Sequence, residues 1–173
     1  QNEKREMNGG DATLILKAGR EKSLLRLHPW VFSGAIDKLK GHAGPGATVA
    51  VRAADGRFLA WAAYSPASQI RARAWSFREA DYPDEAWLRA RVARAVARRA
   101  ASVRDADAMR LAHAEADGLP GLVADRYTDL LVVQIGSAGA ERWRDVLIDA
   151  LREASGCARI YERSDADVRA LEG

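Results

Sequence analysis

Cysteine is almost absent from this chain of 173 residues, which contains only Cys157. A single cysteine excludes a disulfide within the chain and leaves no Cys/His cluster of the zinc-binding type. No apolar run approaches the roughly 18 residues that a membrane-spanning helix needs. The first ten residues are polar and mixed in charge, unlike the apolar core of a secretory signal. We therefore expect a cytoplasmic protein with no membrane segment and no metal site.

Charge is unevenly divided between the two halves of the chain. Residues 1–104 hold 19 Lys and Arg against 10 Asp and Glu, a net charge of +9. Residues 105–173 hold 8 against 14, a net charge of −6, so the whole chain carries +3. Such asymmetry indicates that the basic half meets a polyanion such as a nucleic acid. The alternative is a solvated, arginine-rich surface without a partner.

Residues 13–77 have the pattern of short strands joined by tight turns. Asp55-Gly56 is a hairpin signal, and Pro29 ends the only helix expected in this part, from about Arg20 to Leu27. The alternation of apolar and polar residues predicts four strands, at Thr13–Lys17, Thr48–Ala53, Phe58–Tyr64 and Gln69–Phe77. Several short strands with such turns indicate a small β-barrel.

Residues 79–173 change to helices and strands in alternation, so the expected fold class is α+β, with a small α/β unit after the barrel. A helix near Pro83 carries an apolar stripe that includes Arg99, which must extend toward solvent. Leu130–Ile135 is a continuous apolar run and is expected to be a buried strand. The other predicted elements are strands at Met109–Glu115, Leu122–Tyr127 and Arg159–Glu162, a helix at Ala140–Ser155 ending at Gly156, and a short helix from Asp165.

A basic segment with aromatic residues between its cations is the first candidate site. Cations hold phosphates, and aromatic rings stack on unpaired bases, so this mixture is typical of RNA recognition. The alternative places Trp30 and Phe32 in the barrel core, with the cations solvated. The candidate RNA-binding residues of this segment are Lys17, Arg20, Lys22, Arg26, His28 and Trp30.

A second candidate row lies on the strand at Gln69–Phe77. Arg71 and Arg73 are two residues apart and share one face of the strand with Gln69. This row points outward if Ile70, Ala72 and Ala74 point into the barrel. We therefore expect Arg71 and Arg73 to offer a second contact for phosphates.

Three other features are interpreted as structural. The stretch Gly136-Ser-Ala-Gly139 follows a strand and opens a helix, but it has too few glycines for a nucleotide-binding fingerprint. Cys157 follows the C-terminal end of a helix, where the dipole disfavours a thiolate, so a packed cysteine is expected rather than a nucleophile. The acidic residues Glu115, Asp117, Asp125 and Asp129 have no calcium-loop spacing and are assigned to turns.

Two stretches of the sequence resemble a known family. The first is Gly19–Gly34, Gly-Arg-Glu-Lys-Ser-Leu-Leu-Arg-Leu-His-Pro-Trp-Val-Phe-Ser-Gly, followed by Asp55–Ala60 and Ser68–Arg73. The second is Glu115–Tyr127, Glu-Ala-Asp-Gly-Leu-Pro-Gly-Leu-Val-Ala-Asp-Arg-Tyr, followed by Tyr161–Asp165 and Val168–Gly173. From about residue 13 to its end, the chain resembles the RlmI-type methyltransferases of large-subunit ribosomal RNA. One departure is Trp61-Ala-Ala-Tyr64, where the family usually has a Gly before the Tyr.

The resemblance implies a PUA-like RNA-binding domain over residues 12–78 and a linker helix with a middle α/β domain over residues 79–173. It places a Rossmann-like domain, which binds S-adenosylmethionine, beyond the end of this chain. Family members methylate carbon 5 of a cytosine in 23S ribosomal RNA, a reaction that needs a cysteine thiolate. By this resemblance, the chain itself has no catalytic residue and no cofactor site.

The resemblance also implies a role for residues in the second stretch. They brace the junction with the catalytic domain or line its substrate cleft; the alternative is salt bridging within the chain. These residues are Asp125, Arg126, Tyr127, Arg163 and Asp165.

Two other hypotheses stay open at this point. One is a free-standing PUA-type RNA-binding module, and the other is a ribosome-assembly adaptor whose acidic half docks on a protein. The sequence does not decide the oligomeric state.

Overall fold

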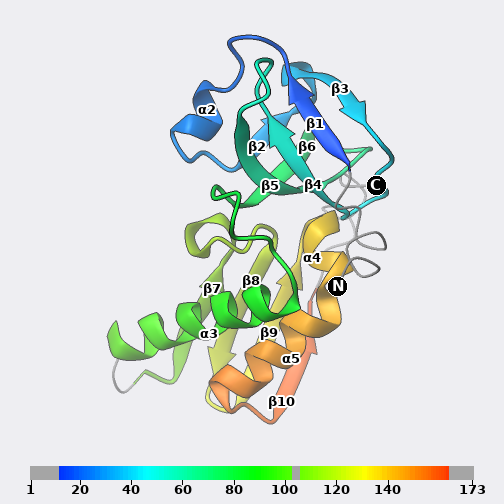
Figure 1. Cartoon of the computed structure of the whole chain (residues 1–173). Coiled ribbons are helices and arrows are strands. Elements are labelled where there is room, and N and C mark those ends of the chain that lie inside the picture. The colour runs from blue at the N-terminus through cyan, green and yellow to red at the C-terminus, as the bar shows by residue number, and fades with distance from the viewer. Residues whose placement is uncertain (1–11, 103–105, 164–173) are drawn as a thin grey trace.

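The computed structural model describes residues 12–102 and 106–163, and their strands form two sheets joined by helix α3 (Figure 1). The sheet nearer the N-terminus has the order β2-β6-β5-β4-β1-β3 and curls on itself, and we call it the curled sheet. Its strands are β1 (Thr13–Leu16), β2 (Trp30–Phe32), β3 (Ile36–Lys40), β4 (Thr48–Arg52), β5 (Phe58–Tyr64) and β6 (Ile70–Ser76). The chain is thus a mixed α+β structure.

Small and branched apolar side chains fill the inside of the curled sheet. Leu14 and Leu16 alternate with half-buried positions along β1, and Val49 and Val51 face them from β4. Ala72 and Ala74 point into the same core from β6, as the alternation predicts. The four predicted strands are all present within one or two residues of their expected bounds.

Two strands and the length of one helix differ from the sequence prediction. β2 and β3, of three and five residues, were missed, because they owe their extended form to pairing with β6 and β1. Helix α2 (Lys22–Leu25) is shorter than the expected Arg20 to Leu27, since Leu27 adopts a left-handed backbone with φ of 62°. A 3₁₀ turn, η1 (Ser33–Ala35), joins β2 to β3.

Helix α3 (Glu85–Ser102) begins two residues after Pro83, which was expected in its first turn. The Asp84 carboxylate accepts the Trp87 backbone N–H at 2.8 Å, which caps the helix start. The predicted stripe is buried at Leu88, Val92, Ala95 and Val96, whereas Val103 lies outside the described residues. The Arg99 side chain extends out of this stripe, as expected, but it pairs with a carboxylate: its Nη2 lies 3.1 Å from Asp117 Oδ2.

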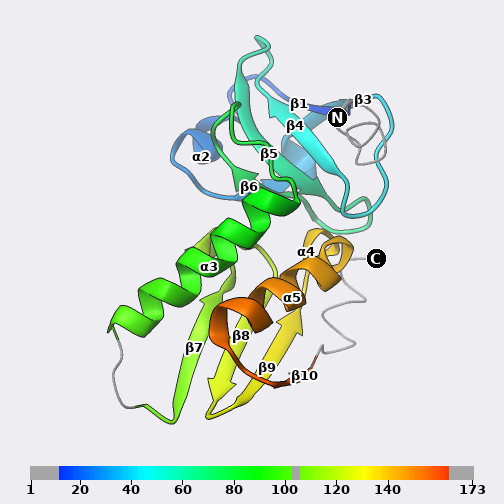
Figure 2. The same ribbon diagram turned by 60° about the horizontal axis from the view of Figure 1, so that its bottom comes forward.

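The second sheet has the order β10-β9-β8-β7 and carries helices on one face only (Figure 2). α3 and α5 lie side by side over this face. The apolar run Leu130–Ile135 was expected to be buried throughout, but only one side of this strand is buried. Leu131, Val133 and Ile135 are buried, and the residues between them are half-buried. The strands are β7 (Ala108–His113), β8 (Leu122–Tyr127), β9 (Leu130–Ile135) and β10 (Arg159–Glu162), with a 3₁₀ turn η2 (Ala114–Asp117) after β7.

The helix expected at Ala140–Ser155 is divided into α4 (Ala138–Arg142) and α5 (Arg144–Ser155). The division falls at Trp143, whose backbone leaves the helical region with ψ of 13°. Gly156 ends α5 in a left-handed conformation, as predicted. The short helix expected from Asp165 lies outside the described residues.

Candidate nucleic-acid interface

The basic segment forms an exposed surface around helix α2. Leu24 is the buried anchor of this helix, at 3% exposure, so the residues on either side of it project outward. The backbone N–H groups of Arg26 and His28 bond back to Ser23, which holds the segment in a compact turn. Leu25 and Leu27 are exposed, at 56% and 64%. We call the surface made by Arg20, Lys22, Leu25, Arg26, Leu27, His28 and Phe32 the α2 surface.

The cations of the α2 surface have no described anionic partner, unlike many arginines elsewhere in the chain. Among the residues that the structure describes, none forms an ion pair with Arg20, Lys22 or Arg26, and all three are exposed. Exposed arginines elsewhere, such as Arg57 and Arg159, are paired with carboxylates. The α2 surface therefore has positive charge that no described carboxylate neutralises.

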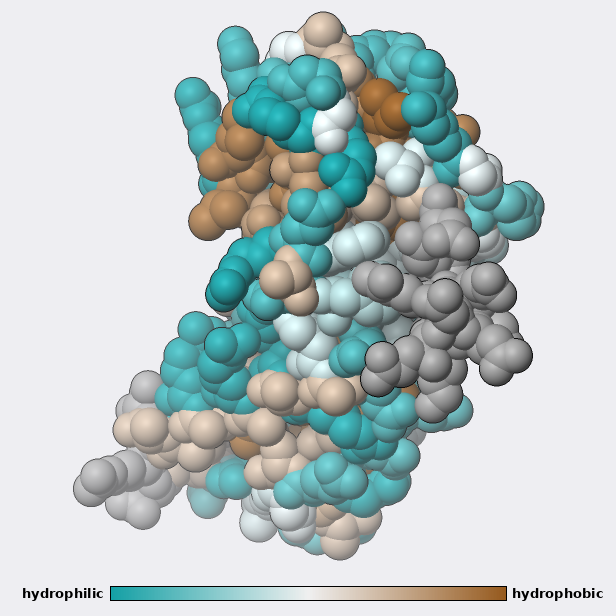
Figure 3. Space-filling view, in the orientation of Figure 1, coloured by the Kyte–Doolittle hydropathy of each residue, from teal (hydrophilic) through white to brown (hydrophobic). Residues whose placement is uncertain are grey.

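Aromatic rings border these cations, and none of them belongs to the core of the curled sheet. Trp30 lies edge-on to His28 at 5.6 Å and to Phe32 at 6.3 Å. Trp30 is half-buried and Phe32 is 50% exposed, so the alternative that both rings fill the core is wrong. Brown surface flanked by teal side chains lies over the α2 side of the molecule in Figure 3. Such adjacent apolar and cationic groups suit contact with bases and phosphates.

The arginine row on β6 is only partly on the surface. Arg71 and Arg73 are half-buried, and Arg71 Nε donates to the Ser68 carbonyl at 3.0 Å. The expected outward row ends after Arg73, because Trp75 on the same face is buried at 2% and packs against the core of the second sheet. Arg73 pairs in register with Trp30 across β2 and β6, which places it beside the α2 surface.

Lys17 connects this surface to the opposite edge of the curled sheet. Its Nζ donates to the Gly34 carbonyl at 3.1 Å, and its side chain is exposed. It lies at the end of β1, immediately before the turn that leads into α2.

The curled sheet and the second sheet meet at close contacts. A Cβ built on Gly139 would lie 2.4 Å from Ala63 Cβ and 3.0 Å from the Trp75 ring, so only glycine fits there. Ser137 caps α4 by accepting the Ala140 N–H at 3.1 Å and donates to the Pro120 carbonyl. The stretch Gly136–Gly139 therefore serves packing and capping, in agreement with its structural interpretation.

The acidic residues that were assigned to turns each have a separate partner. Glu115 accepts from Trp30, and Asp117 is buried between Arg98 and Arg99. Asp129 pairs with Arg159, whose guanidinium lowers the pKa of this carboxyl. Within the described residues, no group of three His, Cys, Asp or Glu side chains could hold a metal ion. Cys157 is free and buried in the core beneath the second sheet.

The residues expected at a domain junction lie in different environments. Asp125 accepts two hydrogen bonds from Arg110, at 2.7 and 3.0 Å, and this carboxylate raises the pKa of Arg110. Tyr127, the last residue of β8, is 50% exposed. Arg126 Nε is buried without a hydrogen-bond partner among the described residues, and Arg163 is exposed. Asp165 lies outside the described residues.

Comparison with known proteins follows this division of the chain. A family model described as a PUA-like domain matches residues 14–77, which span the curled sheet. A ribosomal RNA large subunit methyltransferase I from Pseudoalteromonas translucida is 46% identical over 164 residues, 94% of this chain and 41% of its own length. The protein of the same name from Shewanella amazonensis is 49% identical over 160 residues, 91% of this chain and 40% of its own length.

Over more than nine tenths of its length, the chain is similar to these ribosomal RNA large subunit methyltransferases. It spans about two fifths of the length of the curated relatives that it matches.

Two solved structures share the fold of this chain, each at 18% sequence identity. One, described as a SAM-dependent methyltransferase from Streptococcus mutans, has a TM-score of 0.74 and covers 88% of this chain and 40% of its own. Another, described as a methyltransferase complexed with SAH, has a TM-score of 0.76 and covers 90% and 41%. No helix among the described residues has the length and apolarity to cross a membrane.

The sequence prediction missed three members of the α2 surface. Leu25, Leu27 and Phe32 were not proposed as site residues, although all three are among the most exposed large apolar side chains. The available signal was the run of apolar residues around Pro29, which exceeds what a four-residue helix and a three-residue strand can bury.

Proposed function

We propose that this chain is the RNA-binding part of a methyltransferase that acts on ribosomal RNA. The observation that carries the proposal is the α2 surface, where Arg20, Lys22 and Arg26 are exposed and unpaired beside the exposed ring of Phe32. Its location in a PUA-like domain supports contact with structured RNA.

Each group of this surface has a distinct part in the proposed contact. The guanidinium and ammonium groups bind phosphates and fix the orientation of the RNA. Phe32 stacks on an unpaired base, and the exposed Leu25 and Leu27 cover its apolar edge. His28 is part of the surface, and Lys17, Trp30, Arg71 and Arg73 border it and add further contacts to the RNA.

The finer assignment follows the family. In the proposal, residues 12–78 bind 23S ribosomal RNA in the cytoplasm, and residues 79–173 connect them to a catalytic Rossmann-like domain. That domain would bind S-adenosylmethionine and methylate carbon 5 of a cytosine, so this chain holds neither the cofactor nor the reacting thiolate. The burial of Cys157 at 4% exposure supports this division, because a nucleophile must reach its substrate.

We propose that the residues around Tyr127 contact the catalytic domain or its substrate. Support comes from the exposed phenol ring of Tyr127 and from the buried Arg126 Nε, which has no partner among the described residues. Arg163, and Asp165 outside the described residues, are assigned to the same contact. Asp125 holds Arg110 and positions β8 against β7.

A titration of the chain with a labelled 23S ribosomal RNA fragment at several salt concentrations tests the proposal. The triple variant Arg20→Ala/Lys22→Ala/Arg26→Ala should bind more weakly and with a salt slope lower by about 2 to 3. The matched control is Arg78→Ala/Arg152→Ala/Arg159→Ala, which removes three exposed, ion-paired arginines and should change the slope little. Wild-type binding within the non-specific range of about 10⁻⁴ to 10⁻⁶ M, or equal effects of the two triple variants, would contradict the proposal.

A further inference from the structure

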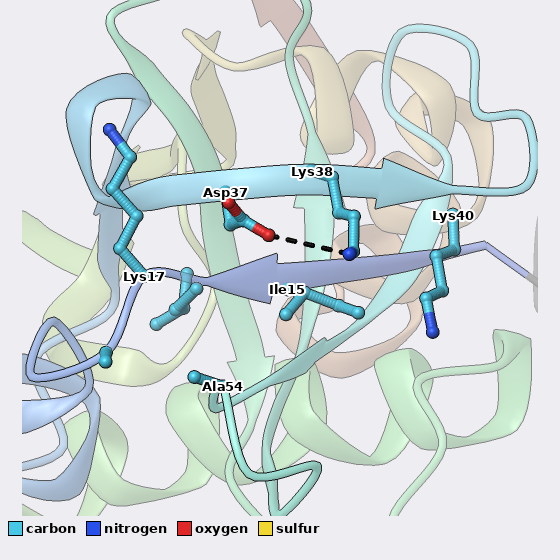
Figure 4. Close-up of a pocket in the computed structure, with 8 residues that line it drawn as sticks. Ile15, Lys17, Asp37, Lys38, Lys40 and Ala54 are labelled. Carbon is cyan, nitrogen blue, oxygen red and sulfur yellow. Dashed lines mark ion pairs between the residues drawn. The ribbon is translucent and has the colours of Figure 1, made fainter.

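A shallow groove along β1 and β3 carries a second cluster of cations, outside the α2 surface (Figure 4). Lys17 borders it at the end of β1, and Lys38 and Lys40 border it from β3. Ile15 and Ala54 supply apolar lining between these lysines. We call this feature the lysine groove.

Strand register fixes the direction of two of these lysines. Lys38 lies opposite Ile15 and Lys40 opposite Thr13 in the antiparallel pair of β1 and β3. Residues two apart on a strand share a face, about 7 Å from one another. Both side chains extend from β3 toward β1, whereas Lys17 points toward the start of β3 from the other end of β1 (Figure 4). The three ammonium groups thus follow the length of the groove.

The charge of the lysine groove is only partly compensated. Asp37 is the one carboxylate that lines it among the residues that the structure describes, and its Oδ2 lies 3.7 Å from Lys38 Nζ. Both side chains of this pair are more than half exposed, at 58% and 51%, so the pair is weak and easily exchanged for another anion. Lys17 is held by a neutral carbonyl, that of Gly34. Three lysines against one aspartate leave the groove with a net charge of +2.

The shape and lining of the lysine groove favour phosphates over bases. It is shallow, and no aromatic side chain lines it, so an unpaired base would have no ring to stack on. Ammonium groups spaced along an open surface act as point charges toward phosphate oxygens. Lys17 also precedes the turn into α2, so one end of the groove lies at the start of the segment that carries the α2 surface.

We propose that the lysine groove binds the phosphate backbone of the RNA that the α2 surface holds. The RNA would then pass around the edge of the curled sheet, with its unpaired base at Phe32 and a paired segment along Lys38 and Lys40. This inference rests on the proposed function and enlarges its footprint by two residues that belong to no other site.

The test is the double variant Lys38→Gln/Lys40→Gln, titrated with a 23S ribosomal RNA stem-loop at about 50 and 200 mM salt. Loss of two phosphate contacts lowers the salt slope by about 2, so the ratio of wild-type to variant affinity should rise about tenfold from 200 to 50 mM. Lys38→Arg/Lys40→Arg, which keeps both charges, should retain the wild-type slope. The control Arg78→Gln/Arg152→Gln removes two exposed cations elsewhere and should also retain it.

The possible outcomes distinguish a failure of the lysine-groove proposal from a failure of the proposed function. A wild-type slope in the Lys38→Gln/Lys40→Gln variant overturns the groove and leaves the proposed function standing. Failure of the wild-type chain to bind RNA above the non-specific range overturns both. If the same variant loses binding to polyglutamate and keeps its RNA affinity, the groove serves an acidic polypeptide and the proposal is wrong. Thermal unfolding of the variants should match wild type, because both lysines are exposed.

Discussion

The indole Nε1 of Trp30 donates a hydrogen bond of 2.9 Å to Oε1 of Glu115, although 85 residues separate the two in the chain. Trp30 lies on β2, at one edge of the curled sheet, and Glu115 lies in the turn η2 that follows β7 of the second sheet. The bond therefore joins the strand beside the α2 surface to the second sheet. It also explains why Trp30 is half-buried while its neighbour Phe32 is exposed.

We predict that Trp30 and Glu115 are energetically coupled. In a double-mutant cycle of Trp30→Phe and Glu115→Ala, urea unfolding should give a coupling of about 1 kcal/mol, the usual net value of such a hydrogen bond. Trp61→Phe with Glu115→Ala is the control, since Trp61 Nε1 donates instead to the Glu79 carbonyl. A Trp30–Glu115 coupling no larger than that of the control pair would show that the bond adds nothing to stability.

We predict a large loss of stability for Asp117→Ala. This carboxylate has no exposed side-chain surface and accepts from Arg98, from Arg99 at 3.1 Å and from the His113 backbone N–H at 2.7 Å. Its removal leaves a part-buried N–H and two guanidinium groups without their acceptor, which should cost about 2–4 kcal/mol in urea unfolding.

The comparison for Asp117 is Asp149→Ala. Asp149 is 52% exposed and pairs with Arg152 at 3.1 Å on the surface of α5. Its loss should cost less than about 1 kcal/mol. Equal effects of the two substitutions would mean that burial of Asp117 does not determine its contribution.

We predict that Arg159→Gln raises the pKa of Asp129. Two hydrogen bonds from Arg159, at 3.0 and 2.6 Å, hold the pKa of this carboxyl below its ordinary 3.8. A lowered pKa in the folded state stabilises the protein above the unfolded-state pKa, and this contribution is lost as the pH falls through the folded-state pKa. The difference in stability between wild type and Arg159→Gln should therefore vanish in acid.

An NMR titration of the Asp129 side chain in both proteins provides the measurement. Asp55 is an internal control, because Arg57 lowers its pKa and Arg159→Gln should leave that shift unchanged. An Asp129 titration that is the same in both proteins would contradict the assignment of the shift to Arg159.

Local sequence pattern was sufficient for strands that are bounded by turn signals or dominated by apolar residues. β5, β8, β9 and β10 have the bounds that the sequence predicts, and Gly156 ends α5 as expected. β2 and β3 were missed because their extended form depends on partners distant in the chain, Ala72 for Val31 and Ile15 for Lys38. The break at Trp143 likewise has no proline or glycine to mark it.

The residues of the candidate site that local sequence marks were predictable, and those that depend on contacts between distant residues were not. Positive charge in the basic segment is visible in the sequence, so Arg20, Lys22 and Arg26 were proposed as RNA-binding residues, and all three are exposed in the structure. That Arg71 has a carbonyl partner and that Trp75 is covered depends on contacts within the folded chain. Lys38 and Lys40 were not proposed, because only the pairing of β3 with β1 brings them to the same groove as Lys17.

We predict that Phe32→Ala weakens binding to RNA with an unpaired loop and spares binding to a fully paired duplex. Stacking of one base on an aromatic side chain contributes about 1–3 kcal/mol, so the dissociation constant for the loop RNA should rise about 5- to 150-fold. Phe32 is 50% exposed and lies outside both cores, so the variant should unfold at the wild-type temperature.

Tyr161→Ala is the matched control, because this ring is 60% exposed but lies on β10 of the second sheet. Its removal should leave the affinity for both RNAs unchanged if the α2 surface alone stacks a base. An equal loss of affinity for loop RNA and for duplex RNA in Phe32→Ala would mean that Phe32 maintains the shape of the surface and does not stack on a base, because an unpaired base is present only in the loop. No loss on either RNA would remove Phe32 from the interface and leave its cations as the whole of the contact.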